Sequence, residues 1–247
     1  KIAYDRWPRK SLVDHFLEPD LSADAFRRGD GLISEFAAAT FEASVRRTEA
    51  EVTVEMRGRG HVYDAEVEIR KFVTISAARP NELQVRYQLQ RLPEFAVIHF
   101  APEFNFATMP GGASDRYFYD ESGTQLGTLD SCQVLDSIER LGLVDEWQGL
   151  DVSLEFSRPA GVWTFPIETI SQSESGFELV HQSVAVVPHW QFIATDAGTW
   201  SVDIRLVLDT SLARARQLGE IGDRRQTSDD ESTEVPADAI ENSVGTL

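Results

Sequence analysis

Cysteine is almost absent from this 247-residue sequence, in which Cys132 is the only one. A single thiol excludes an internal disulfide and a thiolate-rich metal site, so we expect a protein of the reducing cytoplasm. Long apolar runs are also missing: no segment approaches the roughly 20 apolar residues of a transmembrane helix, and residues 2–30 contain no signal-peptide core. The sequence starts at Lys1 rather than methionine, and we expect an excised or processed piece of a longer chain.

The sequence also lacks the short motifs that mark common catalytic centres. It has no glycine-rich phosphate loop and no His-Glu-x-x-His motif, and residues 171–176, Ser-Gln-Ser-Glu-Ser-Gly, lack the first glycine of a nucleophile elbow. The histidines are scattered without the spacing of metal ligands, at His15, His61, His99, His181 and His189. We therefore predict no metal site, no cofactor and no catalytic residue in this chain.

Positive charge is scarce, because 23 basic side chains stand against 41 acidic ones and the net charge is −18. Residues 220–247 carry eight acids and two arginines, so −6 lies there and −12 on the rest. An acidic surface repels phosphate backbones and anionic lipid, which argues against nucleic acids and membranes as partners, whereas a neutral polysaccharide is indifferent to it. Residues 220–247 have no aromatic residue and little to bury, so we interpret them as a disordered acidic tail.

What the sequence has in abundance is alternation of apolar and polar residues. Val52, Val54 and Met56 alternate with polar neighbours, and similar patterns recur over residues 65–70, 83–90, 151–157 and 201–208. Residues 95–106 are nearly all apolar, which predicts a strand buried on both faces. Ten to twelve short strands with few helices predict an all-β fold, a large antiparallel β-sandwich over residues 1–219.

Two short helices and several chain reversals complete this expected fold. Ser11 is a candidate N-cap for a helix over residues 11–18, and residues 211–218 form a second candidate helix. We expect reversals at residues 58–60 and 158–161, loops over residues 109–127, and the end of a strand at Pro166, which cannot donate to a ladder.

A candidate binding surface lies in residues 161–178, where an aromatic strand runs into a polar loop. A flat aromatic ring beside hydroxyl, amide and carboxylate groups suits a sugar, which offers apolar CH faces and a rim of hydroxyls. The candidate residues for substrate binding are Trp163, Ser171, Gln172 and Glu174. The simpler interpretation is a core tryptophan followed by a serine-rich loop.

Three segments resemble the C-terminal β-sandwich domain of glycoside hydrolase family 57 α-amylases and 4-α-glucanotransferases. The family run W-x-F-P-I-x-T-[IL]-S-Q-S-E-x-G-[FW] is matched by Trp163, Phe165, Pro166, Ile167, Thr169, Ile170, Ser171, Gln172, Ser173, Glu174, Gly176 and Phe177. A Y-D-x-x-x-R-x-x-[IL]-x-D-H-F-[IL] segment is matched by Tyr4, Asp5, Arg9, Leu12, Asp14, His15, Phe16 and Leu17. Residues 103–106 resemble its E-[FI]-N-[FL] segment.

This resemblance implies a sandwich of the galactose-mutarotase-like kind that follows a catalytic (β/α)₇ barrel and whose first strands are missing here. The family's catalytic Glu and Asp lie in that barrel, so no catalytic residue is carried over. The implied function is an accessory domain that shapes the substrate cleft, with the barrel and an α-glucan (starch, glycogen or maltooligosaccharide) as partners. His15, Glu103 and Asn105 lie in the matching segments and join the substrate-binding candidates.

Two questions stay open at this point. The pair Asp14 and His15 either faces the cleft or makes an anchoring hydrogen bond from a helix to a neighbouring strand. The chain is also compatible with a self-sufficient aldose-epimerase-like enzyme, in which Glu103 would act with His61, His99 or His181. A non-catalytic module that only packs against a partner is the third possibility.

Overall fold

The structure is a computed structural model, and it describes residues 6–107, 109, 111–173 and 176–219. Its elements are β1 (Val13–Leu17), α1 (Ala23–Arg27), the 3-10 helix η1 (Phe36–Ala38), β2 (Glu42–Arg47), β3 (Glu51–Val62), β4 (Ala65–Ser76), β5 (Arg79–Gln90), β6 (Val97–Ala107), β7 (Arg116–Asp120), β8 (Gln125–Thr128), β9 (Gln133–Asp145), β10 (Leu150–Ser173), β11 (Gly176–Ile193), β12 (Trp200–Asp209) and α2 (Ser211–Gln217). Among these residues, neither α-helix has the length and apolar character needed to cross a bilayer.

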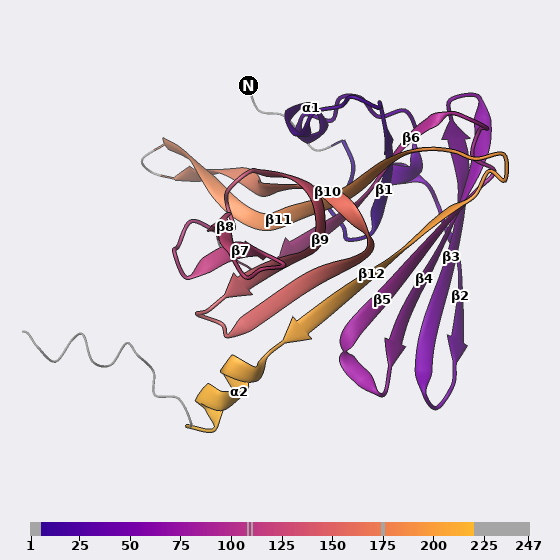
Figure 1. The fold of residues 1–247 in the computed structure, drawn as a ribbon. Helices are drawn as coiled ribbons and strands as arrows, with labels where there is room; N and C mark the ends of the chain where they lie inside the picture. The colour runs from indigo at the N-terminus through magenta and orange to yellow at the C-terminus, as the bar shows by residue number, and fades with distance from the viewer. Residues whose placement is uncertain (1–5, 108, 110, 174–175, 220–247) are drawn as a thin grey trace, which may run out of the picture.

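The strands form one antiparallel sheet that folds over itself. Nine of them follow the order β1-β6-β11-β10-β12-β5-β4-β3-β2, while β9 also pairs with β10 and carries β7, which pairs with β8. Figure 1 shows β2 to β5 as one layer and β9 to β11 as another, with β12 running between them. The all-β antiparallel fold that alternation predicts is therefore confirmed.

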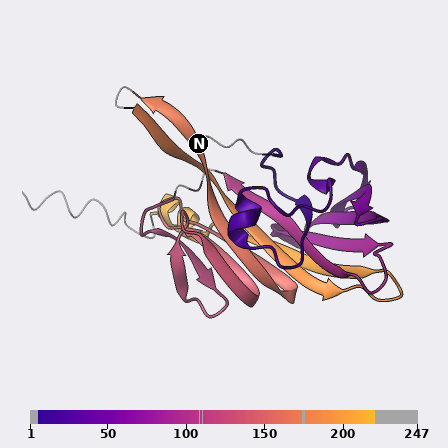
Figure 2. The ribbon, with the colours of Figure 1, turned by 90° about the horizontal axis from the view of Figure 1, so that it is seen from above.

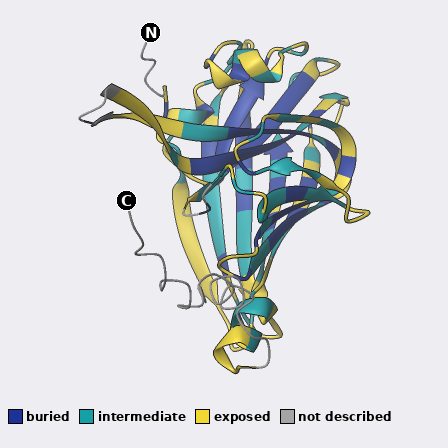
Figure 3. Cartoon of the chain, turned by 90° about the vertical axis from the view of Figure 1, so that its left-hand side faces the viewer, coloured by how far each residue is buried: buried dark blue, intermediate teal, exposed yellow. Residues whose placement is uncertain are grey.

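The buried side chains form two clusters on opposite faces of the middle strands. The larger cluster contains Val162 of β10 and Val186 of β11, whereas Trp163 and Val187, the next residues along these strands, belong to the smaller one. Neighbouring residues of a strand point to opposite faces, so β10 and β11 are buried on both faces there. Phe26 of α1 covers the smaller cluster, and Figure 3 shows the buried middle of these strands in dark blue.

Residues 11–18, predicted as a helix, contain β1 instead. All five residues of β1 are buried, and the strand pairs with β6 from Val13 opposite Glu103 to Leu17 opposite His99. An amphipathic helix buries only one of its faces, whereas this segment is buried on both faces. The backbone of β6 provides the hydrogen-bonding partners that make it a strand. The short N-terminal helix is α1, which begins after Ser22, whose Oγ accepts a hydrogen bond from the backbone N–H of Ala25 (3.3 Å).

Gly58 and Gly60, where a reversal was expected, lie inside β3, and the chain turns at residues 63–64. A Cβ at Gly58 would lie 2.5 Å from the ring of Phe41, and one at Gly60 would lie 3.1 Å from the ring of Phe36. The glycines make room for aromatic rings that pack on the strand. The prediction of a turn was wrong because glycine serves close packing as well as reversal.

β10 runs for 24 residues through both positions where it was expected to turn or end. Residues 158–161 contain an irregularity in the pairing with β9 rather than a reversal. The pairing with β9 stops at Thr164, so Pro166 has a hydrogen-bonded neighbour on one side only, where a missing N–H is tolerated. Residues 109–127, expected as loops, contain β7 and the start of β8.

Beyond Pro166 the paired ends of β10 and β11, residues 168–173 and 176–180, project from the body and are called the arm below (Figure 2). At the other end of the molecule α2 confirms the helix predicted over residues 211–218. The predicted acidic tail, residues 220–247, lies outside the described residues.

Candidate functional site

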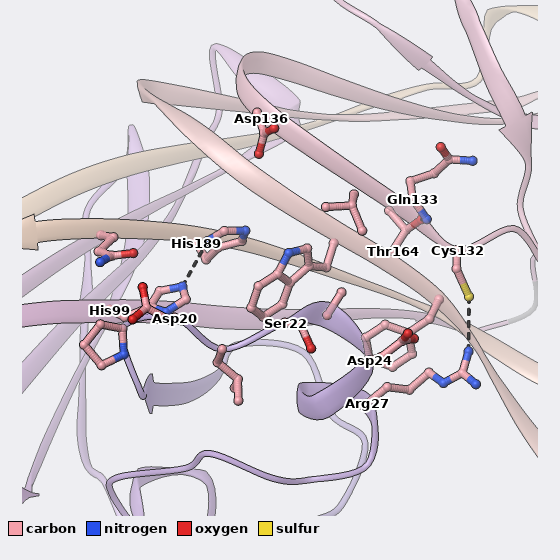
Figure 4. A pocket seen from close by; sticks show the side chains of 17 residues that line it. Asp20, Ser22, Asp24, Arg27, His99, Cys132, Gln133, Asp136, Thr164 and His189 are labelled. Carbon is pink, nitrogen blue, oxygen red and sulfur yellow. Dashed lines mark hydrogen bonds between the residues drawn. The ribbon is translucent and has the colours of Figure 1, made fainter.

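A groove of about 640 Å³ lies between α1 and the strands β6, β9, β10 and β11 (Figure 4). Small-molecule sites measure about 300–1,000 Å³, so the groove has the size of a ligand site. Its polar lining consists of Asp20, Ser22, Asp24, Arg27, His99, Gln133, Asp136, Thr164, His189 and Gln191. No group of three or more His, Cys, Asp or Glu side chains in the described part of the chain is arranged to hold a metal ion.

The walls of the groove are held in place by two hydrogen bonds and one aromatic contact. The backbone N–H of Gln133, the first residue of β9, donates to Oγ1 of Thr164 (3.1 Å), and this hydroxyl donates to the carbonyl of Ser131 (3.2 Å). On the opposite wall Phe26 is fully buried, with its ring centroid 5.6 Å from that of Trp163. The ring therefore holds α1 over the strands.

Two histidines from neighbouring strands form a hydrogen-bonded pair at one end of the groove. Nε2 of His99 lies 3.0 Å from Nδ1 of His189, and Nδ1 of His99 lies 3.1 Å from the carbonyl oxygen of Glu18. A carbonyl only accepts, so Nδ1 of His99 carries its proton and Nε2 accepts the bond that His189 donates from Nδ1. The remaining nitrogen of His189, Nε2, is buried and lies over Gly161, where a Cβ would come within 2.5 Å of it.

Both members of this pair are held in the neutral form. Burial, followed by the charge of His99, lowers the pKa of His189 to about 3. Burial also lowers the pKa of His99 and outweighs the opposing hydrogen bond to the carbonyl of Glu18. At neutral pH the pair consequently presents uncharged ring surface to the groove.

Trp163 lies at the base of the groove, but it is not an open platform. It is 4% exposed, and its ring is flanked by His189 at a centroid distance of 4.2 Å and by Phe26. Neither flank is free for a sugar to stack on, which makes the prediction of a stacking surface wrong. Trp163 is a core residue of the smaller cluster that also lines the groove.

The polar row that follows Trp163 in sequence lies elsewhere. Ser171 lies eight positions after Trp163 on a continuous strand, a span of about 26 Å at about 3.3 Å per residue. Ser171 is exposed on the arm, and Gln172 follows it in β10 opposite Phe177. Glu174 lies outside the described residues. The structure therefore does not bring Ser171 and Gln172 beside Trp163, because β10 continues past Pro166.

Glu103, by contrast, is brought together with the other two candidates, His15 and Asn105. Its Oε2 accepts from Nε2 of His15 and Nε1 of Trp7, both at 3.0 Å. Its Oε1 accepts from Nδ2 of Asn105 (2.7 Å) and a guanidinium nitrogen of Arg9 (3.0 Å). Burial raises the pKa of Glu103, but the His15 bond, the Arg9 charge and the Asn105 bond together outweigh it and lower the pKa to about 2.

This arrangement answers the question of whether His15 faces a cleft or anchors its segment. Both side chains are enclosed, at 1% and 0% exposed, and the bond between them anchors β1 to β6. The anchoring interpretation of His15 is confirmed, although the bond is made from a strand and not a helix. Asp14 points to the opposite face, where its Oδ2 lies 2.8 Å from Nζ of Lys71.

The acid/base pairs required for an aldose-epimerase-like centre are not formed. In the described part of the chain Glu103 makes no hydrogen bond to His61, His99 or His181. His99 bonds to His189, and Nε2 of His181 lies 3.1 Å from the carbonyl oxygen of Met109. Because the one histidine bonded to Glu103 is enclosed rather than facing a cleft, the structure contradicts this alternative.

Sequence reasoning missed most of the polar lining of the groove, including Asp20, Gln133, Asp136 and His189. These residues come from the loop before α1, from β9 and from β11, so no spacing in the sequence connects them. One usable indication was present: Ser22 followed by Asp24 is the start expected of a short helix, and it predicts α1.

Comparison with known structures identifies the class of fold. The structure of a Klebsiella pneumoniae protein assigned as an aldose 1-epimerase superposes with a TM-score of 0.50 at 8% identity, over 83% of this chain and 71% of that one. This supports the galactose-mutarotase-like sandwich as the fold. The likeness extends to the fold alone.

The family follows from the sequence. Residues 1–204 match the family described as "Alpha-amylase/4-alpha-glucanotransferase, C-terminal", and the chain belongs to it. An α-amylase of Pyrococcus horikoshii is 25% identical over 186 residues, which are 75% of this chain and 25% of that protein. The structure of a 4-alpha-glucanotransferase from Thermococcus litoralis superposes with a TM-score of 0.62 at 20% identity, over 83% of this chain and 28% of that one. The chain thus spans about a quarter of the length of these proteins.

Proposed function

We propose that the chain is the non-catalytic C-terminal β-sandwich domain of a cytoplasmic, family 57 enzyme that hydrolyses or transfers α-glucans. In this role it forms part of the wall of the substrate cleft beside a catalytic barrel in the parent protein, and it binds starch, glycogen or a maltooligosaccharide. The names of an α-amylase and a 4-alpha-glucanotransferase among its relatives support the substrate class. The matched residues make up only 25% of that α-amylase, which leaves ample sequence for a barrel.

The observation that carries the non-catalytic role is the state of Glu103. A general acid or base needs a pKa near the working pH and access to substrate. Glu103 is 0% exposed, accepts bonds from four donors and has a pKa of about 2. His189, with a pKa of about 3, is equally unsuited to take a proton at neutral pH. Glu103, the candidate acid or base in the sequence, thus serves the fold.

The test compares the 247-residue chain with its parent enzyme. We expect the isolated chain to bind maltooligosaccharides in calorimetry but to release no reducing ends and transfer no glucan segments. The parent, assayed at the same molar concentration, should do one or the other. Robust turnover by the isolated chain would overturn the proposal.

A module that only packs against a partner is the second candidate, and the arm favours it. Ile170, Phe177 and Leu179 are 43%, 75% and 66% exposed. Ile170 pairs directly with Leu179, and Phe177 is two residues away on the same strand, so the three side chains share one face. If packing is the whole function, replacing Phe177 and Leu179 by serine abolishes association with the separately expressed remainder of the parent, and the chain binds no glucan. Glucan binding by the unaltered chain decides against it.

A further inference from the structure

We infer that the groove beneath α1 is the sugar subsite of this domain and that it takes one or two uncharged sugar residues while rejecting phosphorylated and acidic sugars. The inference rests on the proposed function and adds to it a location and a charge selectivity. Four observations support it, and they concern the base of the groove, one unpaired donor, its rim and its net charge.

The base of the groove is made of neutral rings. Three of the four ring nitrogens of His99 and His189 take part in the hydrogen bonds that link the pair to the carbonyl of Glu18. The fourth, Nε2 of His189, is buried over Gly161, so the two rings present few polar atoms to the groove. The side chains of Trp163 and Phe165 continue this lining. Carbon edges of this kind suit the CH groups of a sugar ring even where no ring face is open for stacking.

One hydrogen-bond donor at the base has no partner. The indole N–H of Trp163 forms no hydrogen bond to another described residue, and it is not among the polar atoms that are buried without a partner, so it is accessible to solvent. Because Trp163 lines the groove, a ligand hydroxyl is a suitable acceptor for this proton.

The rim supplies acceptors from opposite sides. In Figure 4 Asp136 of β9 lies across the groove from Asp24 of α1, and Asp20 lies beside His99. None of these three exposed carboxylates forms an ion pair with another described residue. Carboxylates only accept, so the rim favours a ligand with many O–H donors, which a sugar is.

The charge of the groove selects against anions. Asp20, Asp24 and Asp136 contribute −3, Arg27 contributes +1, and the neutral histidine pair contributes nothing, which leaves −2 at neutral pH. A groove lined by one sign of charge raises the local concentration of ligands of the other sign and repels its own. A neutral glucan escapes this repulsion, whereas a phosphate or uronate ester of the same size does not.

Cys132 provides a direct report on occupancy. It is the only cysteine of the chain, it is exposed, and it lines the groove with its Sγ 3.2 Å from a guanidinium nitrogen of Arg27. We would measure its rate of alkylation by N-ethylmaleimide, an uncharged reagent, in the full 247-residue chain. Maltotriose at about ten times its calorimetric Kd should slow the reaction about tenfold, since about one tenth of the grooves stay empty. Phosphorylated maltotriose at the same concentration should leave the rate unchanged.

Two variants separate charge from shape. Asp20→Asn with Asp136→Asn takes the groove from −2 to 0, so phosphorylated maltotriose should now protect Cys132. Maltotriose should bind about tenfold more weakly, because charge-assisted bonds are replaced by neutral ones. Asp203→Asn is the matched control: this exposed acid on β12 bonds to Arg86 and lies outside the groove, so protection should equal that of the unaltered chain.

Each result decides between the inference and the proposed function. Calorimetric binding of maltotriose without protection of Cys132 overturns the groove as the site and leaves the proposed function standing. Equal protection by the phosphorylated sugar overturns the charge selectivity. Failure of the chain to bind any α-glucan overturns both the subsite and the carbohydrate-binding part of the proposed function. Protection by maltotriose but not by phosphorylated maltotriose in the unaltered chain and in the control, with protection by the phosphorylated sugar gained in the double variant, supports the inference.

Discussion

Replacing Glu103 by glutamine tests whether this enclosed carboxylate stabilises the fold. Glutamine keeps the shape of the side chain but has one oxygen and one NH₂ group. In the native site each carboxylate oxygen accepts two bonds, Oε2 from Trp7 and His15 and Oε1 from Arg9 and Asn105. Whichever way the new amide is oriented, its NH₂ group faces two donors, and the ion pair between Arg9 and Glu103 is lost.

The magnitude follows from the pKa of Glu103. A pKa of about 2 in place of the ordinary 4.5, at about 1.4 kcal/mol per pKa unit, amounts to about 3 kcal/mol in favour of the ionised form. Breaking a buried ion pair by removing one partner costs about 3–5 kcal/mol, which agrees with this figure. We therefore expect Glu103→Gln to lower the free energy of unfolding by about 3 kcal/mol at pH 7.

Urea unfolding of the unaltered chain and the variant between pH 7 and pH 2 measures this effect. The folded pKa of Glu103 is depressed, so its contribution is fully present above pH 4.5 and is lost as the pH falls toward 2. The variant should start about 3 kcal/mol lower and lack this part of the acid dependence. Asp203→Asn, which removes a pair about half exposed on both sides, should cost under about 1 kcal/mol. A loss as small as that for Glu103→Gln, or an unchanged acid dependence, would refute the reasoning.

Three further predictions concern neighbouring sites. The pKa of His189 is about 3 in the folded chain against 6.5 in the unfolded chain. The free energy of unfolding should therefore fall by about 2 kcal/mol between pH 7 and pH 5 through this residue. Urea unfolding of His189→Gln should show a smaller fall over the same pH range. Gly161→Ala places a Cβ 2.4 Å from the His189 ring and should cost about 1–3 kcal/mol in urea, and a neutral effect would contradict the close approach. Lys71→Met removes the partner that lies 2.8 Å from the buried carboxylate of Asp14 and should lower the free energy of unfolding by about 3–5 kcal/mol. Adding Asp14→Leu should restore most of the urea unfolding midpoint. A double variant as unstable as Lys71→Met alone would show that the ion pair is not the cause.

The sequence predicts the sheet well because side-chain alternation is a local property. Val202 and Ile204 alternate with polar neighbours, and both are buried in the larger cluster as that pattern requires. The same locality explains the errors. Whether Gly60 marks a turn or makes room for Phe36 is decided by a residue 24 positions away, which no window of sequence contains. The sequence predicts a helix over residues 11–18 in place of β1, because the strand partner β6 lies more than 80 residues further on.

The candidate site was harder to predict than the fold. Sequence motifs single out Trp163, His15, Glu103 and Asn105, and the last three do meet in space. They meet as a structural cluster, however, and the groove is built mainly from residues that no motif contains. The pairing of His99 with His189 depends on β6 and β11 lying side by side, which is a consequence of topology and not of spacing.

The position of β12 in the sheet has a consequence for how the chain is made. This last strand pairs with β5 on one side and β10 on the other, and the Arg86–Asp203 bond it forms joins residues 117 positions apart. During synthesis, β5 and β10 both emerge without their common neighbour, and each leaves a row of backbone amides and carbonyls unpaired until residue 209 has left the ribosome. Nascent chains stalled before that point should therefore be the ones that aggregate and recruit chaperones.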